Sequence, residues 1–211
     1  VSSIAAIGSE KNNKQVDEDS NWEANQNHTA YAYTKYGAEL EVWRASQEGL
    51  PVVIINPGVI LGGQLWNRSS ASLFKSVANG LRFYPTGDTA LVSLDDVIFT
   101  LVHLMESDIK NERFILVAEN FSQKELLKKI AISLGKKPPK ISLKLSLLYL
   151  LFILEKSLDV LFIRKNFLSI SFIQSLASKQ HYKGSKICSR IDFQYSSIDE
   201  CITKIGKSYK T

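Results

Sequence analysis

The chain of 211 residues contains only two cysteines and no C-x-x-C pair. Cys188 and Cys201 have no histidine nearby at metal-ligand spacing, so neither a disulfide framework nor a zinc site is indicated. Two ordinary thiols in a reducing cytoplasm are the expected interpretation. The three histidines, His28, His103 and His181, also lack the spacing of a metal site or a proton relay. The sequence therefore predicts no metal.

Long apolar runs are missing as well. The chain starts at a valine that opens an apolar stretch without a basic segment before it, which does not support a secretory signal. The most apolar region, residues 141–163, is interrupted by charges, and its charge-free part, residues 145–154, is too short to cross a bilayer core of about 30 Å. No transmembrane helix is expected. A helix packed on the sheet domain is favoured, and interfacial membrane contact is the alternative.

Charge is divided unevenly between the two halves. Residues 1–100 hold 7 basic and 11 acidic side chains, whereas residues 101–211 hold 19 basic and 10 acidic side chains. Solvated lysines on helix faces are the favoured reading of the basic half, and attraction to an acidic substrate or an anionic membrane surface is the alternative. No nucleic-acid-binding module accompanies the basic residues, so nucleic acid is not an expected partner.

Apolar periodicity favours an α/β protein with a parallel sheet. A short apolar run at residues 1–6 and the run PVVIIN at residues 51–56 resemble buried strands, and residues 29–48 between them favour a helix that stops at Gly49. A polar loop at residues 9–27 is long enough to be functional. Further elements are expected as helices at about residues 69–79 and 94–106, a turn at 85–87 and a strand at 113–118.

The pattern becomes helical beyond Ala118, where we expect the sheet to end. Ser122 with Glu125 and Ser197 with Glu200 form two capping boxes, which predict helices at about residues 122–134 and 198–207. We therefore predict two parts: an α/β part at residues 1–118 and a mostly helical part at residues 119–211.

Tyr31 and Lys35 are four residues apart on a predicted helix, so both side chains lie on one face. A tyrosine hydroxyl is a poor proton donor or acceptor at neutral pH, and a neighbouring ammonium group stabilises its phenolate form. The Y-x-x-x-K spacing occurs often by chance. Its context makes it informative, because Ser2-Ser3 precedes the loop, and the next strand runs into N-P-G-V-I-L-G.

This ordered set resembles the extended short-chain dehydrogenase/reductases, the NAD-dependent epimerase/dehydratase family. The resemblance implies the C-terminal half of a Rossmann-type doubly wound parallel sheet, with NAD or NADP as cofactor. It makes residues 1–118 a partial dinucleotide-binding domain and residues 119–211 a mostly helical substrate-binding region. It makes Ser3 the group that binds the substrate oxygen, Tyr31 the proton donor or acceptor, and Lys35 the ligand of the ribose hydroxyls. Pro57, Gly58 and Val59 match the family's turn beside the nicotinamide, where Gly58 permits close approach of the backbone.

Departures from the family pattern bear on the reaction. Ile4-Ala5 replaces the acidic pair that dehydratases carry after the catalytic hydroxyl residue, which disfavours dehydration. Val59 replaces an asparagine of many nucleotide-sugar epimerases, while Asn56 and Leu61 replace an arginine and a tyrosine. The motif N-P-G-V-I-L-G resembles that of the family members related to dihydroflavonol reductase or 3β-hydroxysteroid dehydrogenase. We expect an oxidoreductase for a small, fairly apolar substrate; an epimerase and a non-catalytic dinucleotide-binding or truncated module are the alternatives.

The glycine-rich turn G-x-x-G-x-x-G, which cradles the dinucleotide pyrophosphate, is absent from the sequence. We therefore expect an N-terminally truncated chain that alone binds cofactor weakly and is inactive. The loop before Tyr31 reaches the substrate in many family members, which gives His28 a minor claim to substrate contact. The family resemblance is also compatible with a homodimer.

Overall fold

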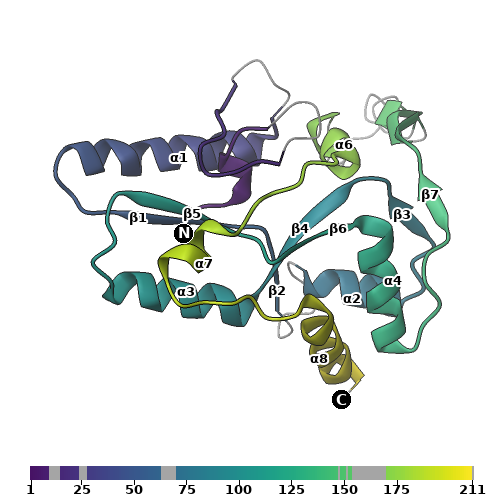
Figure 1. Ribbon diagram of the computed structural model, residues 1–211. Helices are drawn as coiled ribbons and strands as arrows, with labels where there is room; N and C mark the ends of the chain where they lie inside the picture. Colours follow the sequence, from purple (N-terminus) through teal and green to yellow (C-terminus); the bar gives the residue numbers. More distant parts are fainter. Residues whose placement is uncertain are drawn as a thin grey trace.

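Parallel strand pairs flanked by helices form the architecture of the computed structural model, which describes residues 1–9, 15–23, 28–62, 70–146, 148–150, 152–153 and 170–210 (Figure 1). β1 (Val53–Pro57) pairs in parallel with β5 (Glu112–Leu116), β2 (Val59–Leu61) with β4 (Asp88–Ser93), and β3 (Phe83–Pro85) with β7 (Ile141–Leu143). β6 (Glu119–Ser122) adds to β4 in the antiparallel sense. The predicted α/β class with parallel strands is confirmed.

Helices of the described residues surround these strands. They are η1 (Ile4–Ala6), a 3₁₀ turn, and the α-helices α1 (Ala30–Gln47), α2 (Ala71–Ala78), α3 (Leu94–Glu106), α4 (Gln123–Leu134), α6 (Ile170–Ala177), α7 (Lys186–Arg190) and α8 (Ile198–Lys210). The helices that the sequence predicted around residues 29–48, 69–79, 94–106, 122–134 and 198–207 are all present, within a few residues at their ends.

Local side-chain chemistry explains where the helices begin and end. Thr29 caps α1 by accepting a hydrogen bond from the Ala32 amide, and Ser122 caps α4 through the Glu125 amide, as the capping box predicted. Gly49 (φ 101°) follows α1, and Gly135 (φ 67°) ends α4 in the left-handed conformation that glycine adopts at low cost. The sequence signals for these boundaries are therefore reliable.

Two expectations about strands are wrong. Residues 1–6 do not form a strand: Ser2 donates one backbone hydrogen bond to Ile55 of β1 (2.8 Å), and Ser3 then caps the turn η1. The sheet does not end at Ala118 either, because β6 and β7 lie beyond it. Strands β2, β3 and β4 were also not foreseen. Most of these strands are only three or four residues long, too short for alternation of apolar residues to be recognised.

The largest core cluster draws on both predicted parts of the chain. Leu61, Phe74 and Leu91 pack with Ile130 of α4 and Ile198 of α8, and all five are nearly inaccessible to solvent. A second cluster joins β1 and β5 to α3 and α7. A boundary between residues 118 and 119 thus crosses a shared core, and the division into two parts stays a prediction.

The apolar region at residues 141–163 is only partly described. Residues 141–143 form β7, residues 145–146, 148–150 and 152–153 are helical, and residues 154–163 lie outside the described residues. Within the described part of the chain, no helix combines the length and the apolar character needed to cross a bilayer.

Candidate functional site

Tyr31 and Lys35 lie together near the N-terminus of α1. The Lys35 ammonium nitrogen is 5.9 Å from the centroid of the Tyr31 ring. Tyr31 is 55% exposed, so its hydroxyl is accessible, and it sits in the first turn after the Thr29 cap. The free amide groups of a helix N-terminus and a nearby ammonium both favour negative charge. A negatively charged group is therefore favoured at this end of α1.

Ser3 is held beside α1 by the turn that it caps. η1 packs on α1, and the Ser3 hydroxyl oxygen accepts a hydrogen bond from the Ala5 amide (3.2 Å). No acceptor for the hydroxyl hydrogen of Ser3 is found among the described residues, which leaves that hydrogen available to a ligand oxygen. The structure thus brings the Ser3 segment to the helix that carries Tyr31 and Lys35.

A buried carboxylate joins α1 to the serine segment and to β1. Glu39, 4% exposed, accepts hydrogen bonds from the hydroxyl of Ser2 (2.7 Å) and the side-chain amide of Asn56 (2.9 Å) through Oε2. The same Asn56 amide donates to the Ser3 carbonyl oxygen (2.9 Å). Asn56 is fully buried, and its Oδ1 has no partner among the described residues. Asn56 therefore fixes the Ser3 backbone relative to α1.

The network continues through a second buried acid. Arg113 of β5 forms an ion pair with Glu39 Oε1 (3.3 Å) and donates to the backbone carbonyl of Glu18. Glu18 in turn accepts a hydrogen bond from the Ile115 amide through Oε1 (2.9 Å). Burial raises the pKa of the Glu18 carboxyl above its ordinary value, and the Ile115 hydrogen bond opposes that shift. The loop at residues 15–23 is thereby tied to β5.

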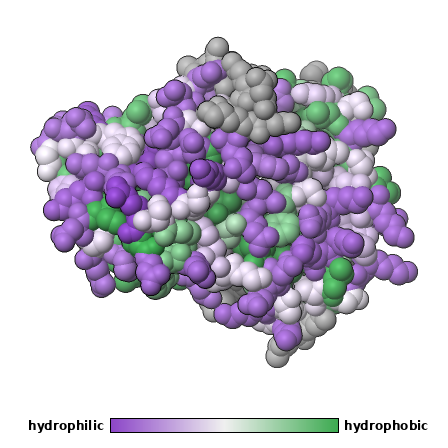
Figure 2. All heavy atoms as spheres, viewed as in Figure 1, coloured by the Kyte–Doolittle hydropathy of each residue, from purple (hydrophilic) through white to green (hydrophobic). Residues whose placement is uncertain are grey.

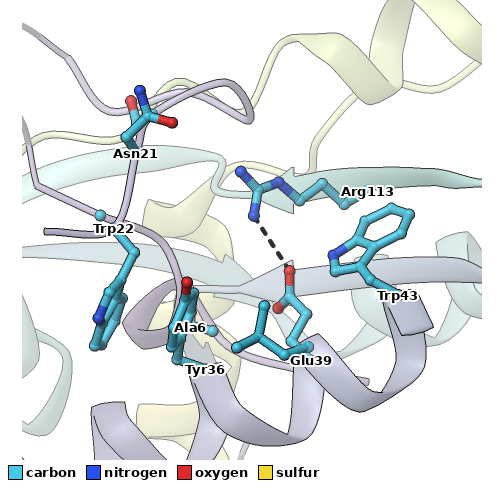
Figure 3. A pocket seen from close by; sticks show the side chains of 10 residues that line it. Ala6, Asn21, Trp22, Tyr36, Glu39, Trp43 and Arg113 are labelled. Atoms are coloured by element: carbon cyan, nitrogen blue, oxygen red, sulfur yellow. Dashed lines mark hydrogen bonds and ion pairs between the residues drawn. The ribbon is translucent and has the colours of Figure 1, made fainter. Parts of the chain in front are cut away.

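A pocket of about 200 Å³ opens over this network (Figure 3). The indole of Trp22 stacks on the ring of Tyr36 (centroids 4.3 Å apart) and on the imidazole of His28 (3.7 Å). The Arg113–Glu39 ion pair lies between these rings and Trp43. The residues that line the pocket are Ala6, Gly8, Ser20, Asn21, Trp22, Tyr36, Glu39, Leu40, Trp43 and Arg113. Tyr31 is not among them, so this pocket is adjacent to the predicted site rather than part of it.

The predicted cofactor-binding turn follows β1. Pro57 is the last residue of β1, and Val59, 39% exposed, begins β2. A Cβ atom on Gly58 would lie 2.5 Å from the Ala90 carbonyl oxygen, so glycine is required there by contact with β4. The glycine was expected to permit close approach of a nicotinamide, and the structure gives it a packing reason in addition.

Glu39, Asn56 and Arg113 were not singled out from the sequence as site residues. The only sequence signal was the presence of Asn56 in the place of an expected arginine. A glutamate in the middle of a helix is usually solvated, and only the tertiary structure buries this one. Glu18 lies in a loop whose sequence carried no comparable signal.

Comparisons with known proteins support the sequence resemblance. A family model described as male sterility protein, of an NAD-binding type, matches residues 1–89. A protein from Synechocystis sp. named as a dihydroflavonol 4-reductase is 27% identical over 96% of this chain and 61% of its own length. Tetraketide alpha-pyrone reductase 2 from Arabidopsis thaliana is 34% identical over 40% of this chain and 28% of its own.

Solved structures show the same fold. A nucleoside-diphosphate-sugar epimerase from Pseudomonas aeruginosa matches 99% of this chain and 65% of its own, with a TM-score of 0.80 and 19% identity. A UDP-glucose 4-epimerase from Thermus thermophilus, solved in complex with NAD, matches 99% of this chain and 62% of its own, with a TM-score of 0.68 and 15% identity. The Synechocystis protein aligns with nearly all of this chain, and this chain spans about three fifths of that protein's length.

Proposed function

We propose that this chain, which resembles the extended short-chain dehydrogenase/reductases in both sequence and fold, supplies the Ser-Tyr-Lys site of an NAD(P)-dependent oxidoreductase. The observation that carries the proposal is the placement of Lys35 5.9 Å from the Tyr31 ring, in the first turns of a helix against which the Ser3 segment packs. The Rossmann-type fold of the structural relatives supports it.

The residues present fit a nicotinamide nucleotide at this place. Among the described residues the Lys35 ammonium has no carboxylate partner, so it is available to the ribose hydroxyls. When bound, the nucleotide supplies or accepts the hydride. In the reducing direction Tyr31 donates its hydroxyl proton to the substrate carbonyl oxygen as the carbonyl carbon gains the hydride, and an alcohol results.

Each of the three side chains has a separate task in this scheme. Ser3 donates its free hydroxyl hydrogen to the substrate oxygen and orients it. Lys35 and the N-terminus of α1 stabilise the phenolate that Tyr31 becomes. Asn56 and Glu39 hold the Ser3 segment against α1 while the proton moves. The alcohol dehydrogenation runs through the same groups in reverse.

A small, fairly apolar carbonyl compound is the substrate class that we propose. The relatives named as dihydroflavonol 4-reductase and tetraketide alpha-pyrone reductase 2 support reduction rather than dehydration. The sequence supports it too, because Ile4 and Ala5 follow Ser3 where a dehydratase carries acidic residues. Trp22 and Tyr36 provide an aromatic wall beside the site.

The test replaces Tyr31 by Phe in the longest gene product that contains this chain. Turnover of a panel of aromatic and aliphatic ketones is followed by the loss of reduced nicotinamide absorbance with NADH and with NADPH. Tyr31→Phe is expected to lower turnover at least about 100-fold, the usual worth of positioned proton transfer, and to leave cofactor affinity unchanged. Tyr33→Phe, two residues away on the same exposed helix end, is the matched control and keeps full turnover. Retained turnover in Tyr31→Phe removes Tyr31 from its assigned role.

A further inference from the structure

A groove with basic walls lies between the C-terminal ends of α2 and α4, where the chain enters β3 and β7. Its volume is about 820 Å³, within the range of small-molecule binding sites. It is lined by Val77, Ala78, Asn79, Gly80, Leu81, Arg82, Lys136, Lys137, Pro138, Lys140 and Ile141. In Figure 1 these elements lie at the opposite end of the molecule from α1, so the groove is separate from Tyr31 and Lys35.

Four cations border the groove, and the described residues supply no counter-charge to them. Arg82, Lys136, Lys137 and Lys140 are all exposed, and none of them forms an ion pair with a carboxylate in the described part of the chain. The C-termini of α2 and α4 each contribute roughly half a negative charge, which four full positive charges exceed. Figure 2 shows largely hydrophilic side chains over α4. The local potential therefore favours an anion.

The floor of the groove is apolar. Val77 is buried, Leu81 is half-buried, and Ile141 is 49% exposed. Phe83, 41% exposed, is the strand neighbour of Ile141 in the β3–β7 pair. A small inorganic anion would leave these apolar groups in water, whereas an apolar chain attached to the anion would cover them.

Backbone hydrogen bonds hold the groove open before any ligand arrives. The Leu81 amide donates to the Ser76 carbonyl (3.1 Å), and the amides of Lys140 and Ile141 both donate to the Arg82 carbonyl (3.1 Å). The two loops that carry the cations are thus joined to each other, which lowers the entropy that binding would cost.

We propose that this groove binds an amphiphilic anion, with its phosphate or carboxylate group among Arg82, Lys137 and Lys140 and its apolar part on Leu81 and Ile141. The site is independent of the oxidoreductase site proposed above. The same chemistry is offered by a free alkyl phosphate and by a phospholipid, and the size of the groove favours the free molecule as its occupant.

Calorimetric titration tests the proposal with dodecyl phosphate below its micelle concentration and with inorganic phosphate. The wild-type protein is expected to bind dodecyl phosphate at least tenfold more tightly than inorganic phosphate. The double variant Lys137→Glu/Lys140→Glu should lose at least tenfold in affinity. Lys179→Glu/Lys183→Glu, which changes the net charge equally at exposed positions outside the groove, is the matched control and should bind as the wild type does.

Three outcomes overturn the proposal. Dodecyl phosphate fails to bind the wild type, or both double variants weaken binding equally, which indicates unspecific attraction to a basic protein. Co-sedimentation with phosphatidylcholine–phosphatidylglycerol vesicles, abolished by Lys137→Glu/Lys140→Glu while dodecyl phosphate does not bind, indicates docking on a bilayer instead. Circular dichroism of both double variants shows that each is folded.

Discussion

Asn56 donates a hydrogen bond from its buried side-chain amide to the carboxylate of Glu39 at 2.9 Å. This contact links the carboxyl-terminal part of β1 to the middle of α1, and the same amide also binds the backbone of Ser3. The segment of the proposed catalytic serine and the helix of the proposed catalytic tyrosine are therefore positioned by a network that itself touches neither hydroxyl.

Replacing Glu39 by Gln should destabilise the fold. The glutamine amide group would face either Arg113 or the donors of Ser2 and Asn56, so at least one buried donor loses its acceptor. We expect a loss of about 3 kcal/mol in the free energy of unfolding, as for other broken buried ion pairs. Urea unfolding measures it, with Glu41→Gln on the exposed side of α1 as the control. Equal midpoints for the two variants would contradict the role of the network.

Replacing Glu18 by Gln should make stability less dependent on pH. The pKa of Glu18 is raised in the folded state by burial, so the folded protein binds more protons than the unfolded chain, and stability falls as pH rises above 4.5. Glutamine keeps an oxygen that accepts from the Ile115 amide and has no charge to bury. As pH rises from 4.5 to neutral, the free energy of unfolding of Glu18→Gln, measured in urea, should increase relative to that of the wild type. The control Asp19→Asn, at an exposed neighbouring position, should show no such increase.

Two glycine-to-alanine changes should have opposite effects. In Gly58→Ala the new methyl group would lie 2.5 Å from the Ala90 carbonyl oxygen, and the backbone of β4 would have to shift. We expect Gly58→Ala to lower the free energy of unfolding by about 1 to 3 kcal/mol. In Gly37→Ala the methyl group meets no atom within 4 Å, and alanine should stabilise helix α1 by about 0.5 to 1 kcal/mol. Thermal unfolding compares the two variants with the wild type, and a Gly58→Ala variant as stable as the wild type would refute the close contact.

Tyr182 should remain neutral well into the alkaline range. Burial raises its pKa to about 12 from 10.0. Because the folded state then holds the proton more tightly, this group makes stability fall as pH rises from 10 to 12. The Cζ carbon resonance of Tyr182, assigned with Tyr182→Phe, should stay unshifted at pH 11 while the protein is folded. A midpoint near 10 would show that this side chain is open to solvent.

The sequence by itself determined the helices and their ends. Helix caps such as Ser122 and terminating glycines such as Gly135 act through neighbouring backbone groups, so their effect is local and can be recognised in the sequence. The proximity of Tyr31 and Lys35 is likewise a local effect, since a spacing of four residues on a helix places two side chains on one face.

Only the tertiary structure decided which polar groups are buried and which short strands pair. Glu39 and Asn56 are 17 residues apart and meet because α1 packs against β1, and β6 exists because β4 offers it a free edge. The unforeseen groove follows the same rule, as Arg82 and Lys140 come together through the β3–β7 pairing. Such contacts depend on how distant segments pack, and no local pattern of residues encodes them.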